Sequence, residues 1–147
     1  MGLDCSHDAW HGSYGSFMRW RIEISRAAGL PPLEFMEGFW EQGSYHDPLT
    51  LMHKQCPETV NAIYRALPIR WECLKPDPLH ILLHHSDCDG EIDAKDCDGI
   101  ADSLKILIHL LPKEVAGGHI GDWRDKTKQF IKGLRLAAKK KQPLTFG

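Results

Sequence analysis

Two short polar clusters contain residue types that can bind a metal ion. The first lies near the N-terminus and contains His7 and His11, which are four residues apart. On a helix this spacing places both imidazoles on one face, about one turn from each other. The second contains His85, Asp87 and Asp89. Zinc and similar divalent metals accept imidazole nitrogen and carboxylate oxygen, so the two clusters together predict one mixed metal site.

The second cluster also contains a residue that can bend the chain. Gly90 permits a tight turn with positive φ, which can fold Asp87 and Asp89 back toward His85. If the bound metal kept a coordination position open, it could activate water, and the protein would then be a metal-assisted hydrolase. The nearest candidate general base would be Asp89 or Glu91.

Each cluster also has a purely structural interpretation. Ser6 and Asp8 are residue types that cap helices, and acid-rich loops are commonly solvated. An EF-hand loop over the second cluster would place His85 and Asp96 where calcium requires an Asp and a bidentate Glu, so the spacing argues against that motif. A nucleophilic Cys88 is disfavoured because neighbouring carboxylates oppose formation of the thiolate. The metal and structural interpretations both stay open.

Charge is divided between two segments. From His84 to Asp102 there are seven acids and one base, whereas from Trp123 to Lys141 there are eight bases and one acid. The basic segment is expected to bind an acidic partner, a nucleic acid or the acidic segment of the same chain, although a solvated helix face is the ordinary interpretation. Five of its basic residues recur at helical spacing beside an apolar stripe: Arg124, Lys128, Lys132, Arg135 and Lys139.

Helical periodicity dominates the elements that must position these residues. The clearest helix is predicted from about Asp122 to Lys141 and ends before Pro143. Two segments are less regular: Leu33–Glu41 is a weak helix, and Ile69–Cys73 alternates as an extended run would. Further helices are predicted from about Phe17 to Ala28 with Gly29 ending it, from Pro57 to Leu67, from Pro78 to about His85 with Asp77 as its cap, and from a capping Asp93 to Pro112.

These elements predict a mainly α protein. The 147 residues suit a single compact domain, 1–147, of about five helices with Pro-rich connections. Hydrophobic residues make up 42% and charged residues 26%, which is typical of a globular protein. The terminal segments GLDC and PLTFG are strand-like, and we expect them to pair as a short two-stranded ribbon joining the termini.

Several classes of protein are disfavoured by the sequence. No stretch approaches the ~18 apolar residues of a membrane span, and the N-terminus does not have the pattern of a secretory signal. The five cysteines include no C-x-x-C pair, so we expect reduced thiols in the cytoplasm. No phosphate-binding glycine motif supports a nucleotide cofactor, which leaves a divalent metal as the one expected cofactor.

Three segments distinguish the chain further: GLDCSHDAWHGSYGSFMRWR, LHHSDCDGEI and QFIKGLRLAA. Together they resemble a family of small proteins from bacteria and phages. That family has no assigned activity, so the resemblance implies no catalytic residue. It implies only a cytoplasmic setting in a bacterium or phage.

Overall fold

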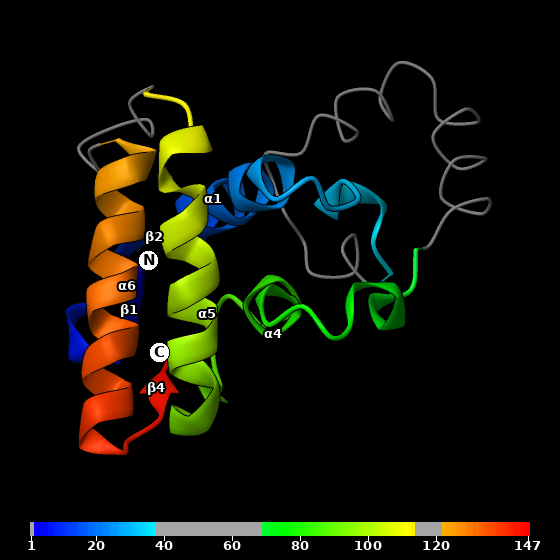
Figure 1. Cartoon of the computed structure of the whole chain (residues 1–147). Helices are drawn as coiled ribbons and strands as arrows, with labels where there is room; N and C mark the ends of the chain where they lie inside the picture. The colour runs from blue at the N-terminus through cyan, green and yellow to red at the C-terminus, as the bar shows by residue number, and fades with distance from the viewer. Residues whose placement is uncertain (1, 38–68, 114–121) are drawn as a thin grey trace.

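The computed structural model describes residues 2–37, 69–113 and 122–147. In these residues the chain is mainly helical with short antiparallel strands, as the sequence predicts (Figure 1). They contain four α-helices rather than about five, and the helix predicted over Pro57–Leu67 lies outside them. The elements are β1 (Gly2–Cys5), β2 (Trp10–Ser13), α1 (Tyr14–Ala27), α4 (Leu79–Leu83), β3 (Glu91–Ile92), α5 (Ala94–Leu107), α6 (Trp123–Lys140) and β4 (Leu144–Thr145), with 3-10 turns at Ser6–Asp8, Leu33–Phe35, Trp71–Leu74 and Ile108–Leu110.

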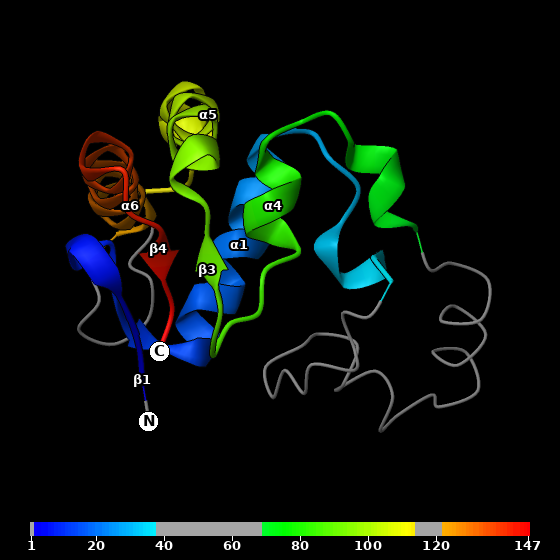
Figure 2. The same cartoon turned by 90° about the horizontal axis from the view of Figure 1, so that it is seen from below.

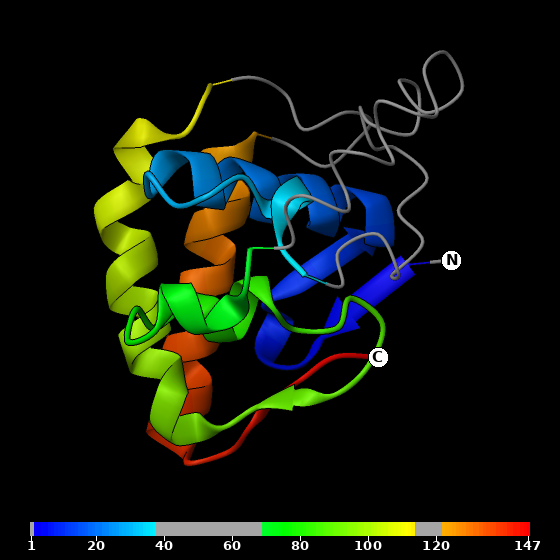
Figure 3. The same cartoon turned by 90° about the vertical axis from the view of Figure 1, so that its right-hand side faces the viewer.

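Among the elements described, α5 and α6 form the most extensive contact. These helices run antiparallel and side by side, while α1 and α4 cross them (Figures 1 and 3). Arg135 of α6 joins the pair by binding Asp98 and Asp102 of α5. The acidic and basic segments of the sequence therefore contact each other within this chain.

Local sequence signals explain where the helices begin and end. The Asp122 side chain accepts a hydrogen bond of 2.7 Å from the Asp125 N–H and caps α6. Gly29 follows α1 with φ +67°, a conformation that glycine adopts without strain, so its predicted role is confirmed. Asp93 occupies the N-cap position of α5, but its side chain makes no capping hydrogen bond, contrary to our expectation. At α4, the Asp77 carboxylate accepts from the Leu79 N–H at 3.0 Å.

Two local predictions are wrong, and a third is tested only in part. His7 lies in a 3-10 turn and His11 in β2, so these residues do not share a helix face. Where the sequence predicts a weak helix over Leu33–Glu41, Leu33–Phe35 forms a turn of 3-10 helix. The residues after position 37 lie outside the described part of the chain. The segment Ile69–Cys73 is not an extended strand, because Trp71–Leu74 forms a 3-10 turn. Its extended pairing is limited to a single bridge from Ile69 to Met36.

The C-terminal strand lies between the two segments of the chain that contain the polar clusters. β4 pairs with β3, with Glu91 opposite Thr145, and β1 pairs with β2. The termini also meet, because Cys5 forms an antiparallel bridge with Phe146 and the Gly147 N–H donates to the Asp4 carbonyl at 3.0 Å (Figure 2). The predicted ribbon therefore exists as a single bridge, while each terminal strand pairs mainly with an internal one.

An aromatic cluster forms the centre of the core. Phe17 and Trp20 of α1 are fully buried against Phe130 of α6, and the rings of Trp20 and Phe130 lie 4.7 Å apart. Trp10 of β2 packs on both α1 rings at 5.2 Å. The Trp20 indole N–H donates to the buried Thr127 hydroxyl at 2.8 Å, which satisfies it in the interior. No helix in the described part of the chain is long and apolar enough to cross a membrane.

Candidate functional site

The first polar cluster forms the tip of the β1–β2 hairpin. His11 lies directly opposite Asp4 in the strand register, and its Nδ1 contacts the Asp4 carboxylate at 2.7 Å. Its Nε2 contacts the carboxylate of Asp8, in the turn, at 2.5 Å. Because carboxylates only accept hydrogen bonds, both ring nitrogens donate when the imidazole is protonated. The hydrogen bonds to Asp4 and then Asp8 raise the pKa of His11.

His7 points elsewhere within the same turn. It adopts a left-handed backbone conformation, with φ 58°, and Asp8 follows it with φ 57°. The side chain is half-buried, and its Nε2 is buried without a hydrogen-bond partner. His7 therefore contributes nothing to the contacts that join His11 to Asp4 and Asp8.

Arg21 of α1 positions the second cluster from inside the core. It is almost fully buried, and its Nη1 donates to the carbonyls of Leu82, Leu83 and His85 at the end of α4. Carbonyls at a helix end lack the N–H groups of a following turn, and a cation there is also favoured by the helix dipole. Of the three, the Leu82 carbonyl also accepts from the His85 N–H at 3.3 Å. Burial lowers the pKa of Arg21 to about 10. Arg21 therefore holds the backbone in place where the loop after α4 begins.

His85 packs against Gly90 of the acidic loop. Gly90 has φ +94°, and a Cβ at this position would come within 3.3 Å of His85 Nε2, so glycine allows the loop to fold back over the ring. His85 Nδ1 donates to the Ser86 carbonyl at 2.7 Å. The ring also stacks on Phe146, with centroids 4.1 Å apart. These contacts account for one ring nitrogen and one face of the imidazole.

The acids of this loop lie near the surface. Asp87 is half-buried and Asp89 is exposed, with its carboxylate 3.8 Å from the Cys88 thiol. The exposed Cys88 also lies 3.4 Å from the Ser86 hydroxyl. No histidine is paired with this thiol among the residues described, so the catalytic interpretation of Cys88 gains no support.

The two clusters lie on either side of the C-terminal segment. Phe146 donates its N–H to the Gly90 carbonyl at 2.9 Å and bridges to Cys5 on its other edge. Within residues 2–37, 69–113 and 122–147, no group of three or more His, Cys, Asp or Glu residues is arranged to hold a metal ion. The structure joins His11 to two carboxylates of its own cluster. A site shared by His7, His11, His85, Asp87 and Asp89 stays a prediction.

The basic segment divides into two kinds of residue. Arg124 donates to the carbonyls of His109 and Leu111 at 3.0 Å and so caps the turn after α5. Arg135 binds Asp102 and, at 2.8 Å, Asp98, and these hydrogen bonds raise the pKa of Arg135. Of the partners that the sequence leaves open, Arg135 contacts the acidic segment of the same chain, and Arg124 contacts backbone carbonyls of this chain.

The lysines of α6 behave differently from the arginines. The lysine face, as we define it, comprises Lys128, Lys132 and Lys139, all exposed, and it is extended by Lys140 and Lys141. None of these forms an ion pair with any residue in the described part of the chain. In contrast, the buried Lys126 donates to the His11 carbonyl at 2.9 Å and lies over the Trp10 ring, and burial lowers its pKa.

Two buried cations, Arg21 and Lys126, are marked in the sequence by their position within an apolar stripe. Arg21 lies at helical spacing from Phe17 and Ile24, within the buried face of α1. Lys126 occupies the same kind of position between Trp123 and Phe130 in α6. A basic residue inside an apolar stripe is thus a sign of an internal contact, since the long stem can be buried while the charged head finds a carbonyl.

Comparisons of the chain with known proteins found no match. No family model matches it, no curated protein matches it, and no solved structure matches it. The resemblance to small bacterial and phage proteins therefore stays a prediction.

Proposed function

We propose that the protein is a non-enzymatic interaction module that binds an acidic segment of a partner protein through its lysine face. The observation that carries this proposal is the contrast along α6. Arg124 and Arg135 are engaged within the chain, while Lys128, Lys132 and Lys139 remain exposed without an ion pair to the described residues. These ammonium groups are available to an external anion.

The spacing of the lysines suits an elongated ligand. Lys128 and Lys132 are one helical turn apart, about 6 Å along the axis, and Lys139 lies about 10 Å further. The helix that carries them is fixed by the Arg135 contacts to α5 and by Phe130 in the core. A rigid row of like charges attracts an extended polyanion and binds it with strong dependence on salt.

Acidic groups on both sides of α6 favour a narrow partner. Asp98 and Asp102 on α5 and Asp4 and Asp8 on the hairpin are exposed, and the chain has a net charge of −2. A duplex nucleic acid is wider than a single helix face and would bring its phosphates close to these carboxylates. An acidic peptide can follow the lysine face alone, so it is the partner we favour.

The test is the binding of a labelled glutamate-rich peptide, measured by fluorescence anisotropy at low and high salt. Lys128→Gln/Lys132→Gln should weaken binding by about tenfold, since two charge contacts are removed. The matched control is Lys105→Gln/Lys113→Gln, which removes the same charge from exposed positions outside α6 and should leave binding unchanged.

A labelled single-stranded DNA of equal charge forms the second arm. Tighter binding of DNA than of peptide, lost in the same double variant, would replace the peptide by a nucleic acid as the partner. Absence of binding by both probes, or an equal loss in the control variant, would refute the proposal.

We further propose that the protein works in the cytoplasm. The four cysteines in the described residues are free thiols. Burial raises the pKa of Cys5 to about 12 and that of Cys97 to about 11. Both thiols therefore rarely form the thiolate, which is the form that is readily oxidised. Free thiols are the expected state in a reducing compartment, which supports this location.

A further inference from the structure

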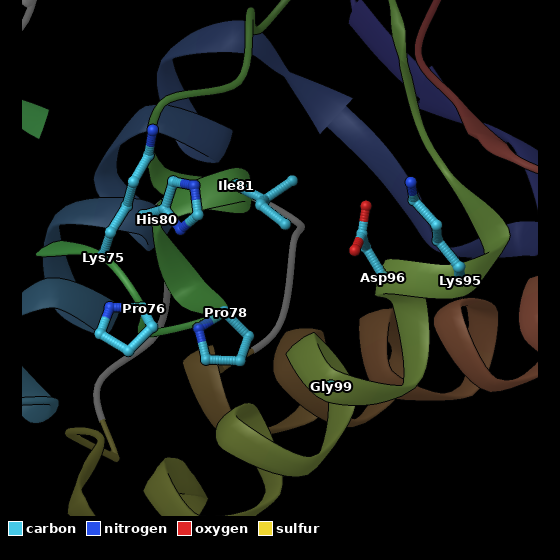
Figure 4. A pocket seen from close by; sticks show the side chains of 8 residues that line it. All are labelled: Lys75, Pro76, Pro78, His80, Ile81, Lys95, Asp96 and Gly99. Carbon is cyan, nitrogen blue, oxygen red and sulfur yellow. The ribbon is translucent and has the colours of Figure 1, made fainter. Parts of the chain in front are cut away.

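A pocket between α4 and α5 lies apart from both polar clusters and from the lysine face. It has a volume of about 410 Å³ and is open to solvent (Figure 4). This volume falls in the range of roughly 300–1,000 Å³ that small-molecule sites occupy. Its lining consists of Lys75, Pro76, Pro78, His80, Ile81, Lys95, Asp96 and Gly99.

The middle of the pocket is apolar. Pro76, Pro78 and Ile81 supply rigid or branched hydrocarbon surface. Gly99 exposes helix backbone, and a Cβ there would lie 3.6 Å from Pro78. The ring of His80 adds a flat surface whose position is fixed, because Nδ1 donates to the Asp77 carbonyl at 2.8 Å. These surfaces suit a flat apolar body.

The charged groups lie at two sides of this apolar surface. Figure 4 shows Lys75 beside His80 on one side, and Lys95 beside Asp96 at the start of α5 on the other. The lining contains two ammonium groups and one carboxylate, which is one positive charge in excess. Each lysine also has an external acid at 3.8 Å, Glu72 or Asp93. Such long, exposed ion pairs are weak, and they leave both ammonium groups able to turn toward a ligand.

We infer that this pocket binds a small organic monoanion with a flat apolar body, the class to which aromatic monocarboxylates belong. The single negative charge balances the excess positive charge of Lys75 and Lys95, while the body covers Pro78, Ile81 and the His80 ring. Asp96 opposes a second negative charge, so a dianion of the same size should bind less well. This inference concerns residues outside α6 and does not depend on the proposed interaction with an acidic partner.

The experiment is an NMR titration of the ¹⁵N-labelled protein with four probes. Benzoate tests the full ligand class, benzamide lacks the charge, acetate lacks the apolar body, and phenyl phosphate carries the second charge. Benzoate should shift the backbone signals around His80, Ile81 and Gly99 and should bind most tightly of the four. Equal binding of benzamide and benzoate, or shifts confined to other surfaces, would overturn the inference.

Variants locate the binding within the pocket. Lys75→Gln/Lys95→Gln should weaken benzoate binding by about tenfold, because both attractive charges are lost. Gly99→Leu should abolish binding, since the new side chain enters the pocket from a helix position that accepts leucine. Lys105→Gln, on the same helix but outside the lining, is the control and should bind as the parent does. Unchanged affinity in both pocket variants would exclude this site.

Discussion

Gly133 of α6 lies directly against Ala9 of the N-terminal turn, with so little space that a Cβ on Gly133 would come 2.7 Å from the Ala9 Cα. Non-bonded carbon atoms essentially never approach so closely, so one of the two segments would have to move. The Gln129 side chain donates to the Asp8 carbonyl at 2.9 Å, and Lys126 donates to the His11 carbonyl. Together these contacts hold the hairpin on α6.

The first prediction follows from this contact. Gly133→Ala should destabilise the protein by about 1–3 kcal/mol, the usual range for overpacking, even though alanine favours a helix. Chemical denaturation with urea measures the free energy of unfolding. Gly99→Ala is the matched control, because a Cβ at that helical position meets Pro78 at an ordinary 3.6 Å. It should be neutral or stabilising, and equal losses in both variants would refute the steric argument.

Arg21 provides the second prediction. Arg21→Met keeps a long side chain in the core but removes the donor that satisfies the Leu83 and His85 carbonyls. Leaving a buried polar group unpaired typically costs about 1–3 kcal/mol, so unfolding by urea should show a loss of at least this size. Arg19→Met changes an exposed residue of the same helix and should stay within about 0.5 kcal/mol. A small effect at Arg21 would mean that water replaces the guanidinium.

The sequence predicts the helices well but not the hairpin. The α6 helix is expected from Asp122 to Lys141 and runs over Trp123–Lys140, since an apolar stripe and a capping residue are local signals. In the hairpin, the four-residue spacing of His7 and His11 is also a local signal, but it favours a helix that does not form. The actual conformation of the hairpin depends on distant contacts, to Gly147 and to Gly133. A short polar segment cannot reveal such partners by its own pattern.

The candidate site was less predictable than the fold for a related reason. The residue type shows that a side chain is charged, but it does not show whether that charge is paired in the folded protein. Arg135 and Lys132 are both basic residues of one helix, yet only Arg135 reaches carboxylates of α5. Which face of α6 meets α5 is decided by packing of the whole core, and that information is spread over the chain.

The third prediction concerns the core contact of Phe130. Its ring is fully buried and lies 4.7 Å from Trp20 and 6.2 Å from Phe17. Phe130→Ala should lower the free energy of unfolding by ~3–5 kcal/mol. The variant loses the burial of the ring, and it leaves a cavity that the packed aromatic cluster cannot close. Urea denaturation measures this loss. Ile131→Ala, a half-buried neighbour on α6, should cost clearly less, and a loss under about 0.5 kcal/mol at Phe130 would place it outside the core.

The last prediction uses pH to separate two roles of His11. Its pKa is raised by Asp4 and Asp8. The unfolded value is about 6.5, so the protonated ring stabilises the folded state fully below that pH. This stability is lost as pH rises through the higher pKa of the folded state. The melting temperature of the parent should therefore exceed that of His11→Gln at pH 5.5, and the difference should shrink by pH 8.5.

A metal held by His7, His11 and His85 predicts the opposite dependence. A ligand imidazole must be neutral, so metal-linked stability is present at neutral pH and lost below about pH 6. EDTA would then lower the melting temperature at pH 7.5 and matter much less at pH 5, and His7→Ala would abolish that effect. The ion-pair role predicts identical melts with and without EDTA, no metal in elemental analysis, and a His11→Gln effect confined to low pH. His109→Gln, at an exposed histidine outside the hairpin, is the control and should change neither series, because it removes an imidazole without altering the His11 contacts to Asp4 and Asp8.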